Sequence, residues 1–176
     1  DGVIIDTESQ YSIFWGGICR NFLGDENLCK KIKGNTLSAI FKCFFDGKID
    51  EQIEITRQLK KFEADMKMEY IPGAIDFLQQ LKNERIPTCL VTSSNIEKME
   101  SVYKKHPEFK DFFTNILTAE NFTRGKPDPE PYLLGAKICG TQIENCFVFE
   151  DSFNGLKSGK SAGAKVVGLA TTNSAE

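Results

Sequence analysis

The sequence of 176 residues predicts an α/β protein whose core is a Rossmann-like parallel sheet, with a small all-helical unit inserted into that core. Three observations lead to this prediction. Residues 7–70 carry apolar side chains at helical spacing, short apolar runs alternate with amphipathic helices after Pro72, and another apolar run, at residues 3–5, precedes the helical region. We therefore expect a core made of residues 1–6 and 71–176 around an insertion at residues 7–70.

The insertion is predicted to contain three or four helices and no strand. Two apolar stripes recur at intervals of three and four residues, which is the pattern of one buried helix face. The first stripe is Tyr11, Phe14, Trp15, Ile18 and Phe22, and the second is Ile55, Leu59, Phe62 and Met66. A shorter apolar segment lies between them at residues 40–45.

The core is predicted to alternate helices with strands. We expect helices at residues 74–81, 96–105, 130–139 and 154–162, and strands at residues 87–92, 116–117, 147–149 and 166–169. This alternation favours a parallel sheet with helices on both faces, because right-handed crossovers return each strand in the same direction.

Composition limits the classes of function. With 22 Lys+Arg against 25 Asp+Glu, the net charge of −3 provides no basic surface for nucleic acid or an anionic membrane. No apolar run approaches the roughly 20 residues of a membrane helix, and no signal-peptide pattern precedes Asp1. The six cysteines contain no CxxC pair and most lie within apolar stretches, which indicates reduced thiols in the core. We expect a cytoplasmic monomer that acts on a small molecule.

Four groups of polar residues follow predicted strands or precede the insertion. They are Asp1, the TSSN segment at residues 92–95, Lys126, and the acidic pair Glu150 and Asp151. Ligands of open parallel sheets collect beyond the carboxyl ends of the strands. These groups are therefore the candidate site residues.

The acidic pair allows two interpretations. Two adjacent carboxylates at the end of an apolar strand supply hard oxygen ligands for Mg²⁺, and they repel each other when no cation is present. Alternatively, Asp151 and Ser152 only cap the following helix. The pair alone does not decide between metal binding and capping.

Lys126 and the hydroxyl residues each allow two interpretations as well. The three prolines of GKPDPEP hold the segment after Lys126 extended, which would aim its ammonium group, although surface loops also contain many solvated lysines. Thr92 and Ser93 could bind phosphate just before a helix, or could cap that helix. Taken together, the acids, hydroxyls and lysine indicate phosphate chemistry with Mg²⁺, in which a carboxylate can attack phosphorus to form an acyl phosphate.

The ordered motifs resemble those of the haloacid dehalogenase (HAD) superfamily, in its phosphatase and β-phosphoglucomutase-like branch. The motifs are DGVIIDTE at residues 1–8, LVTSS at 90–94, GKPDPEPYL at 125–133 and FEDSFNG at 149–155. Residues 7–70 stand in the position of the helical cap of that family. The resemblance implies a HAD-like fold and a Mg²⁺-dependent phosphatase for a small organic phosphate monoester, with sugar phosphates among the candidates.

The same resemblance implies a role for each site residue. Asp1 matches the general acid/base that protonates the leaving oxygen and later activates water, and its backbone carbonyl matches a Mg²⁺ ligand. Lys126 matches the lysine that binds phosphate and neutralises the nucleophile. The phosphate-binding residues implied are Thr92, Ser93, Ser94 and Lys126, and the metal-binding residues are Asp1, Glu150 and Asp151.

The nucleophile of the family lies two residues before the aspartate of the Asp-Gly motif, which here falls before Asp1. Asp1 does not fit as the nucleophile itself. Its acid/base partner would then be Val3, which has no proton to exchange. We therefore expect the natural protein to carry an upstream apolar strand that ends in Asp-x, and to continue past residue 176.

Two departures from the mutase branch favour a phosphatase. A His and an Arg that handle sugar phosphate in that branch correspond to Tyr11 and Leu37 here.

A β-phosphoglucomutase-like sugar phosphomutase is the alternative, and a non-catalytic phosphate-binding relative would fit a chain that truly starts at Asp1. A receiver domain is disfavoured because its acidic pair comes first, and a dehalogenase because the acidic pair suits Mg²⁺ and phosphate.

Overall fold

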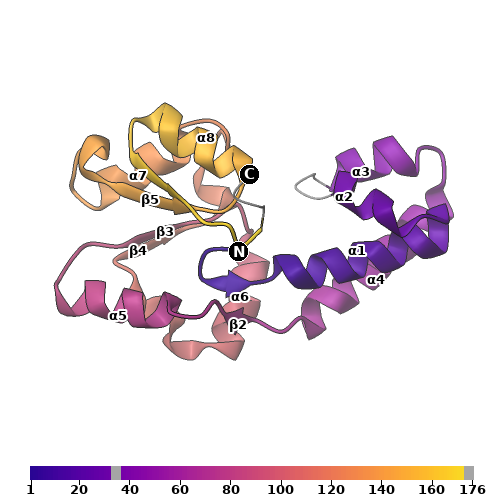
Figure 1. Cartoon of the computed structure of the whole chain (residues 1–176), viewed down its shortest axis with the longest axis horizontal. Coiled ribbons are helices and arrows are strands. Elements are labelled where there is room, and N and C mark those ends of the chain that lie inside the picture. The colour runs from indigo at the N-terminus through magenta and orange to yellow at the C-terminus, as the bar shows by residue number, and fades with distance from the viewer. Residues whose placement is uncertain (33–36, 173–176) are drawn as a thin grey trace. The chain divides into compact units, whose positions relative to one another are not determined.

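The computed structural model describes residues 1–32 and 37–172, and the chain divides into two compact units (Figure 1). Thr7–Lys67 form a helical unit, and Asp1–Asp6 together with Met68–Glu176 form an α/β unit. The role of the helical unit as a cap stays a prediction.

The described part of the helical unit contains α1 (Glu8–Leu23), the 3₁₀ turn η1 (Glu26–Leu28), α2 (Cys29–Ile32), α3 (Leu37–Phe44) and α4 (Ile49–Asp65). Its buried core comprises Trp15, Ile18, Cys19, Ile32, Ile40, Phe45 and Ile55. The two predicted apolar stripes meet, since Phe14 of α1 stacks on Phe62 of α4 with ring centroids 4.7 Å apart. Burial of one such side chain contributes about 1.5–3 kcal/mol, so packing between helices stabilises this unit.

A strand is present where we expected only helix. β2 (Glu69–Tyr70) pairs antiparallel with β1 (Ile5–Asp6), so the prediction that no strand occurs up to residue 70 is wrong. The N-terminal apolar run thus contributes to an antiparallel pair and not to a parallel one. The chain makes a tight turn just before β1, in which Gly2, at φ +66°, donates its N–H to the Ile5 carbonyl at 2.8 Å.

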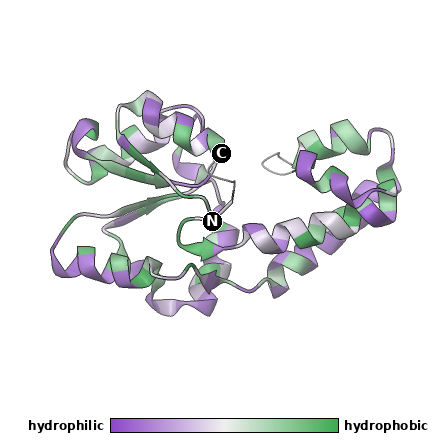
Figure 2. Ribbon diagram, in the orientation of Figure 1, coloured by the Kyte–Doolittle hydropathy of each residue, from purple (hydrophilic) through white to green (hydrophobic). Residues whose placement is uncertain are grey.

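The other four strands in the described part of the chain form two parallel pairs. β3 (Cys89–Val91) pairs with β4 (Asn115–Leu117), and β5 (Phe147–Glu150) pairs with β6 (Lys165–Gly168). These strands lie where the sequence predicted them, and their direction confirms the α/β class. The two pairs form separate two-stranded sheets in this structure, and their parallel strands with surrounding helices are consistent with the Rossmann-like core that we expected. Hydrophobic residues predominate in these strands (Figure 2).

The helices of this unit are α5 (Ala74–Asn83), α6 (Ile96–Lys105), α7 (Glu130–Ile138) and α8 (Phe153–Ala162), with 3₁₀ turns η2 (Pro107–Phe112), η3 (Ala119–Asn121) and η4 (Ile143–Asn145). Val148 of β5 faces α8, where a Cβ at Gly159 would lie only 3.1 Å from its side chain. Phe149 points to the opposite face and contacts Phe77 of α5, with ring centroids 5.4 Å apart. Because successive strand residues point to opposite faces, helices cover both faces of β5, as predicted.

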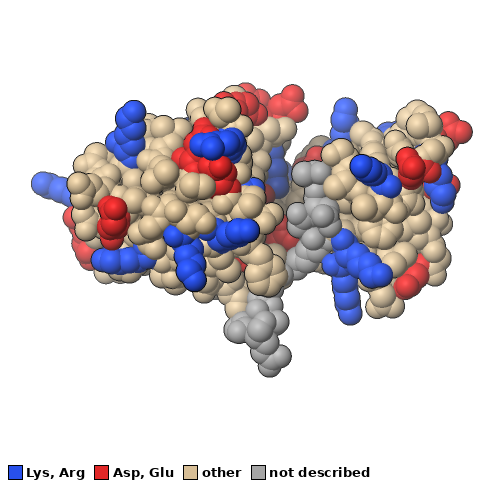
Figure 3. All heavy atoms as spheres, turned by 90° about the horizontal axis from the view of Figure 1, so that it is seen from above, with Lys and Arg blue, Asp and Glu red and all other residues tan. Residues whose placement is uncertain are grey.

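The surface carries both signs of charge. On the face drawn in Figure 3, acidic and basic side chains are interspersed. All six cysteines are free thiols; Cys19 is buried, but Cys43 is exposed and so lies outside the core where we expected it. In the part of the chain that the structure describes, no helix has the length and apolar character needed to cross a membrane.

Candidate active site

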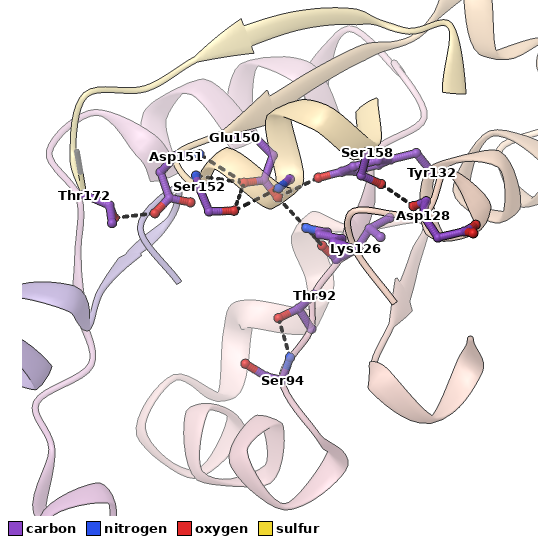
Figure 4. Close-up of polar contacts among 12 residues, drawn as sticks. Thr92, Ser94, Lys126, Asp128, Tyr132, Glu150, Asp151, Ser152, Ser158 and Thr172 are labelled. Atoms are coloured by element: carbon purple, nitrogen blue, oxygen red, sulfur yellow. Dashed lines mark hydrogen bonds and ion pairs between the residues drawn. The ribbon is translucent and has the colours of Figure 1, made fainter. Parts of the chain in front are cut away.

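Lys126 joins the carboxyl ends of two strands (Figure 4). Its Nζ donates to the carbonyl of Val91, the last residue of β3, at 3.1 Å, and forms an ion pair with Oε1 of Glu150, the last residue of β5. The side chains of Lys126 and Glu150 are only 11% and 6% exposed. Burying two charges is costly unless their hydrogen bonds are satisfied, so the other partners of Glu150 are informative.

Both oxygens of Glu150 accept further hydrogen bonds. Tyr132 of α7 donates its hydroxyl to Oε1 at 2.6 Å. Oε2 accepts from the N–H groups of Asp151 and Ser152, each at 3.1 Å, and from the Ser152 hydroxyl at 3.0 Å. Burial disfavours the charged form, but Lys126 and the hydrogen bonds outweigh burial and lower the pKa of Glu150. Glu150 is therefore held as a carboxylate.

The start of α8 is shaped around Glu150. Ser152 is the N-cap residue of α8, and its hydroxyl accepts from the Gly155 N–H at 3.1 Å. A Cβ at Gly155 would overlap the Glu150 carboxylate. The cap of α8 thus comes from Ser152, and the side chain of Asp151 has other partners.

Asp151 lies where the turn at Gly2 and the loop after β6 meet. Its Oδ2 accepts from the hydroxyl of Thr172, and the hydroxyl of the neighbouring Thr171 donates to the Gly2 carbonyl. Gly2 has φ +66°, and a Cβ at this position would overlap the Asp151 carboxylate. Only glycine combines this backbone conformation with so close an approach.

The Asp1 carboxylate lies beside the loop after β3. Its Oδ2 accepts from the Ser94 hydroxyl at 3.2 Å and forms an ion pair with Lys98 Nζ at 2.6 Å. The Asp1 carboxylate is therefore held by one donor from the loop after β3 and one from α6.

The hydroxyl residues after β3 differ in their contacts. Thr92 is buried, donates its N–H to the Leu117 carbonyl of β4 at 2.9 Å, and accepts from the Ser94 N–H at 3.1 Å. Ser94 in turn reaches Asp1. Ser93 is exposed, and within the described residues it makes no hydrogen bond to the other predicted site residues. Thr92 therefore orders the loop, and Ser93 is accessible from solvent.

The segment that carries Lys126 is a turn, so the prediction of an extended segment is wrong. The Asp128 N–H donates to the Gly125 carbonyl at 3.0 Å, and the Lys126–Pro127 peptide bond is cis. The fully buried Ser158 of α8 donates its hydroxyl to the Asp128 carbonyl at 2.6 Å. This turn, anchored on α8, directs Lys126 toward Glu150.

Four further residues belong to this region although none of them was predicted as a site residue. They are Lys98, Tyr132, Thr171 and Thr172. Thr171 and Thr172 follow the last strand, so the rule that identified the acidic pair applies to them too. Lys98 and Tyr132 lie on helices. Tyr132 falls inside the GKPDPEPYL motif, but only the tertiary contacts give either residue a role.

The oxygen atoms of Asp1 and of the acidic pair suit Mg²⁺ as ligands. The Asp151 carboxylate and the Asp1 carbonyl, which belongs to the peptide bond to Gly2, are hard oxygen donors, while the Glu150 oxygens already accept hydrogen bonds. Over residues 1–32 and 37–172, no group of three or more His, Cys, Asp or Glu side chains is arranged to hold a metal. Mg²⁺ commonly takes one or two carboxylates and completes its shell with waters and substrate phosphate, so the residues present fit this ion.

Comparison with known proteins places the chain in a family. The family model described as haloacid dehalogenase-like hydrolase matches residues 1–169. Hexitol phosphatase A of Escherichia coli (strain K12) is 32% identical over 178 residues, which cover 96% of this chain and 79% of that protein. Three further curated relatives are matched over only 29–49% of their own length.

Solved structures show the same fold. A HAD hydrolase of family IA, variant 3, from Entamoeba histolytica HM-1:IMSS has a TM-score of 0.81 and 24% identity, over 97% of this chain and 81% of that chain. A putative β-phosphoglucomutase from Thermotoga maritima has a TM-score of 0.74 and 25% identity, over 96% of this chain and 81% of that chain. The resemblance read from the four motifs is therefore confirmed, and the chain belongs to the haloacid dehalogenase-like hydrolases.

Proposed function

We propose that the protein is a Mg²⁺-dependent phosphatase that hydrolyses a small organic phosphate monoester through an aspartyl-phosphate intermediate. The observation that carries this proposal is the position of Lys126, whose ammonium group bridges the end of β3 and Glu150 at the end of β5. A cation held beside hydroxyl residues and an acidic pair suits a phosphate group bound together with a divalent cation. Hexitol phosphatase A, a relative at 32% identity, is named for a reaction of this class.

The proposed phosphate site consists of Lys126 and the loop of Thr92, Ser93 and Ser94. This loop leads into α6, whose N-cap residue is Asn95. N–H groups at the start of a helix carry partial positive charge, which adds to the full charge of Lys126. The exposed Ser93 hydroxyl is accessible to a bound anion.

The proposed metal site uses Asp1 and the acidic pair. Asp151 contributes its carboxylate and Asp1 its backbone carbonyl. Glu150 contributes its charge, because donors from Lys126, Tyr132 and the start of α8 already occupy its oxygens. When bound, Mg²⁺ neutralises charge on the phosphoryl oxygens.

Asp1 is the proposed general acid/base. By the family pattern, the expected position of the nucleophilic aspartate is two residues before Asp1. The carboxylate of the nucleophile attacks phosphorus, the bond between phosphorus and the ester oxygen breaks, and the leaving oxygen takes a proton from Asp1. Water then attacks the acyl phosphate and gives a proton to Asp1, which releases phosphate and restores both carboxyl groups.

A sugar phosphomutase is the second candidate, because one similar solved structure is described as a putative β-phosphoglucomutase. Two positions weigh against it. Tyr11 donates its hydroxyl to Glu63 at 2.8 Å, and burial raises its pKa, so Tyr11 is a neutral side chain engaged inside the helical unit. Leu37, the first residue of α3, has no polar group, and residues 33–36 before it lie outside the described residues.

Two further predictions belong to this proposal. The resemblance assigns the helical unit the role of a cap that excludes bulk water during the reaction. We also expect a monomer in the cytoplasm.

A phosphate-release assay tests the proposal. The protein, expressed with its natural upstream residues, is incubated with a panel of small phosphate monoesters in Mg²⁺ or in EDTA. We expect release of inorganic phosphate from at least one ester in Mg²⁺, and loss of this activity in EDTA, in Lys126→Ala and in Asp151→Asn. Lys157→Ala, at an exposed lysine of α8, serves as the matched control and should keep full activity.

The other outcomes separate the alternatives. Hydrolysis that survives EDTA, or that neither substitution affects, contradicts the mechanism. An isomerised product without release of phosphate identifies a mutase. Binding of phosphate esters without turnover identifies a non-catalytic relative.

A further inference from the structure

Lys98 is a charged residue that none of the motifs uses. It is the third residue of α6, and its N–H donates to the side chain of the N-cap residue Asn95 at 2.9 Å. The N-terminus of a helix carries partial positive charge, so a lysine in the first turn is disfavoured unless it has an anionic partner. The position of Lys98 is therefore explained by a contact outside its own helix.

The structure gives Lys98 such a partner in Asp1. Lys98 Nζ lies 2.6 Å from Asp1 Oδ2, and the Ser94 hydroxyl donates to the same oxygen at 3.2 Å. The side chains of Lys98 and Asp1 are only 20% and 31% exposed. Helical side chains lean toward the N-terminus of their helix, which brings Nζ back to the loop after β3. Two donors on one oxygen hold the carboxylate in one orientation.

We propose that Lys98 is a positioning residue that orients the Asp1 carboxylate for proton exchange with the leaving oxygen of the ester. This inference rests on the proposed function, in which Asp1 is the general acid/base. Because Lys98 and Ser94 hold Oδ2, Oδ1 is the oxygen that carries the proton. When the bond between phosphorus and the ester oxygen breaks, its electron pair goes to the ester oxygen, and the proton on Asp1 Oδ1 is transferred to the ester oxygen.

A role in proton transfer predicts a dependence on the leaving group. An alkyl ester leaves as an alkoxide, which needs a proton, whereas p-nitrophenolate is a weak base and leaves without one. A lysine that only bound phosphate, or that only stabilised the fold, would affect both esters by the same factor. The ratio between the two esters therefore distinguishes positioning of Asp1 from the other roles.

The experiment compares kcat/KM for p-nitrophenyl phosphate and for the best alkyl phosphate of the panel, using the protein with its natural upstream residues. Lys98→Met should lower kcat/KM at least about tenfold for the alkyl ester and less than about threefold for p-nitrophenyl phosphate. Lys98→Arg, which keeps a cation within reach of Asp1, should restore most of the loss. Lys104→Met, at an exposed lysine of the same helix, should change neither value.

Thermal unfolding of each variant shows whether it is folded, and Lys98→Gln replaces Lys98→Met if the latter unfolds. An equal loss for both esters, or no loss for either, overturns the role of Lys98. Failure of the proposed function gives a different result, because the protein without substitutions would then hydrolyse neither ester.

Discussion

Lys126 and Glu150 form a buried ion pair that links the carboxyl end of β3 to the carboxyl end of β5. The two strands belong to different parallel pairs, so this contact connects parts of the α/β unit that share no ladder of hydrogen bonds. The same lysine is the proposed phosphate ligand. Stability and activity are therefore expected to depend on one side chain.

Removal of the Lys126 charge should destabilise the α/β unit. Lys126→Met leaves the Glu150 carboxylate buried without its cation, which costs about 3–5 kcal/mol. The double variant Lys126→Met/Glu150→Gln should recover most of this loss, since no unpaired charge remains. Urea unfolding measures both values, and Lys157→Met on α8 should stay within about 0.5 kcal/mol of the starting protein. A Lys126→Met variant of unchanged stability would contradict the importance of the pair.

Comparison of Gly2→Ala with Gly140→Ala should separate the loss of stability caused by the backbone conformation from the loss of activity caused by displacement of Asp151. Gly2 and Gly140 have similar φ values of +66° and +70°, but only at Gly2 would a Cβ meet other atoms, namely those of Asp151 and Thr172. Both Gly→Ala variants should lose about 1–2 kcal/mol from the left-handed backbone. Gly2→Ala should in addition lose about a hundredfold in phosphate release, because Asp151 must move. Equal activity of the two variants would show that the Asp151 position is not critical.

Removal of the Ser158 hydroxyl should lower activity, because this hydroxyl holds the turn that carries Lys126. Its hydroxyl donates to the Asp128 carbonyl at 2.6 Å, and Ser158→Ala leaves that carbonyl without its donor, at a cost of about 1–3 kcal/mol. We expect lower kcat together with lower stability. Ser161→Ala, at an exposed serine of the same helix, is the matched control. If both variants behave like the starting protein, the turn does not depend on α8.

Local signals in the sequence predicted most elements of the α/β unit. The helix expected at residues 96–105 is α6 (Ile96–Lys105), because Asn95 supplies a side-chain cap and the apolar residues Met99 and Val102 face the core. Gly163 ends α8 at φ +93°, where a glycine is favoured. Caps and stops of this kind are short-range, so the sequence alone reveals them.

Long-range contacts account for what the sequence did not reveal. The apolar run at residues 3–5 has the composition of a parallel strand, but the turn at Gly2 and the pairing with β2 override that preference. The partner of Lys98, Asp1, is 97 residues away in the chain. Ser158 of α8, which donates to the Asp128 carbonyl, is 30 residues away from Asp128. No local pattern encodes contacts at such separations.

The cysteines should differ in reactivity with pH. Burial raises the pKa of Cys89 to about 12 and that of Cys19 to about 11, whereas Cys43 is exposed. At pH 8, about one part in 10⁴ of a thiol with a pKa near 12 is thiolate, and each added pH unit raises this fraction about tenfold. Iodoacetamide labelling of the native protein, followed by mass spectrometry of its peptides, should therefore modify Cys43 first. Labelling of Cys89 as fast as Cys43 would contradict the partial burial of Cys89.

The most direct measurement of the central claim is a crystal structure of the protein, with its natural upstream residues, in the presence of Mg²⁺ and inorganic phosphate. The account predicts phosphate within hydrogen-bond distance of Lys126 and of the loop at Thr92, with the metal ion on the Asp151 carboxylate beside it. Phosphate and metal bound at separate places, or phosphate bound away from Lys126, would contradict it.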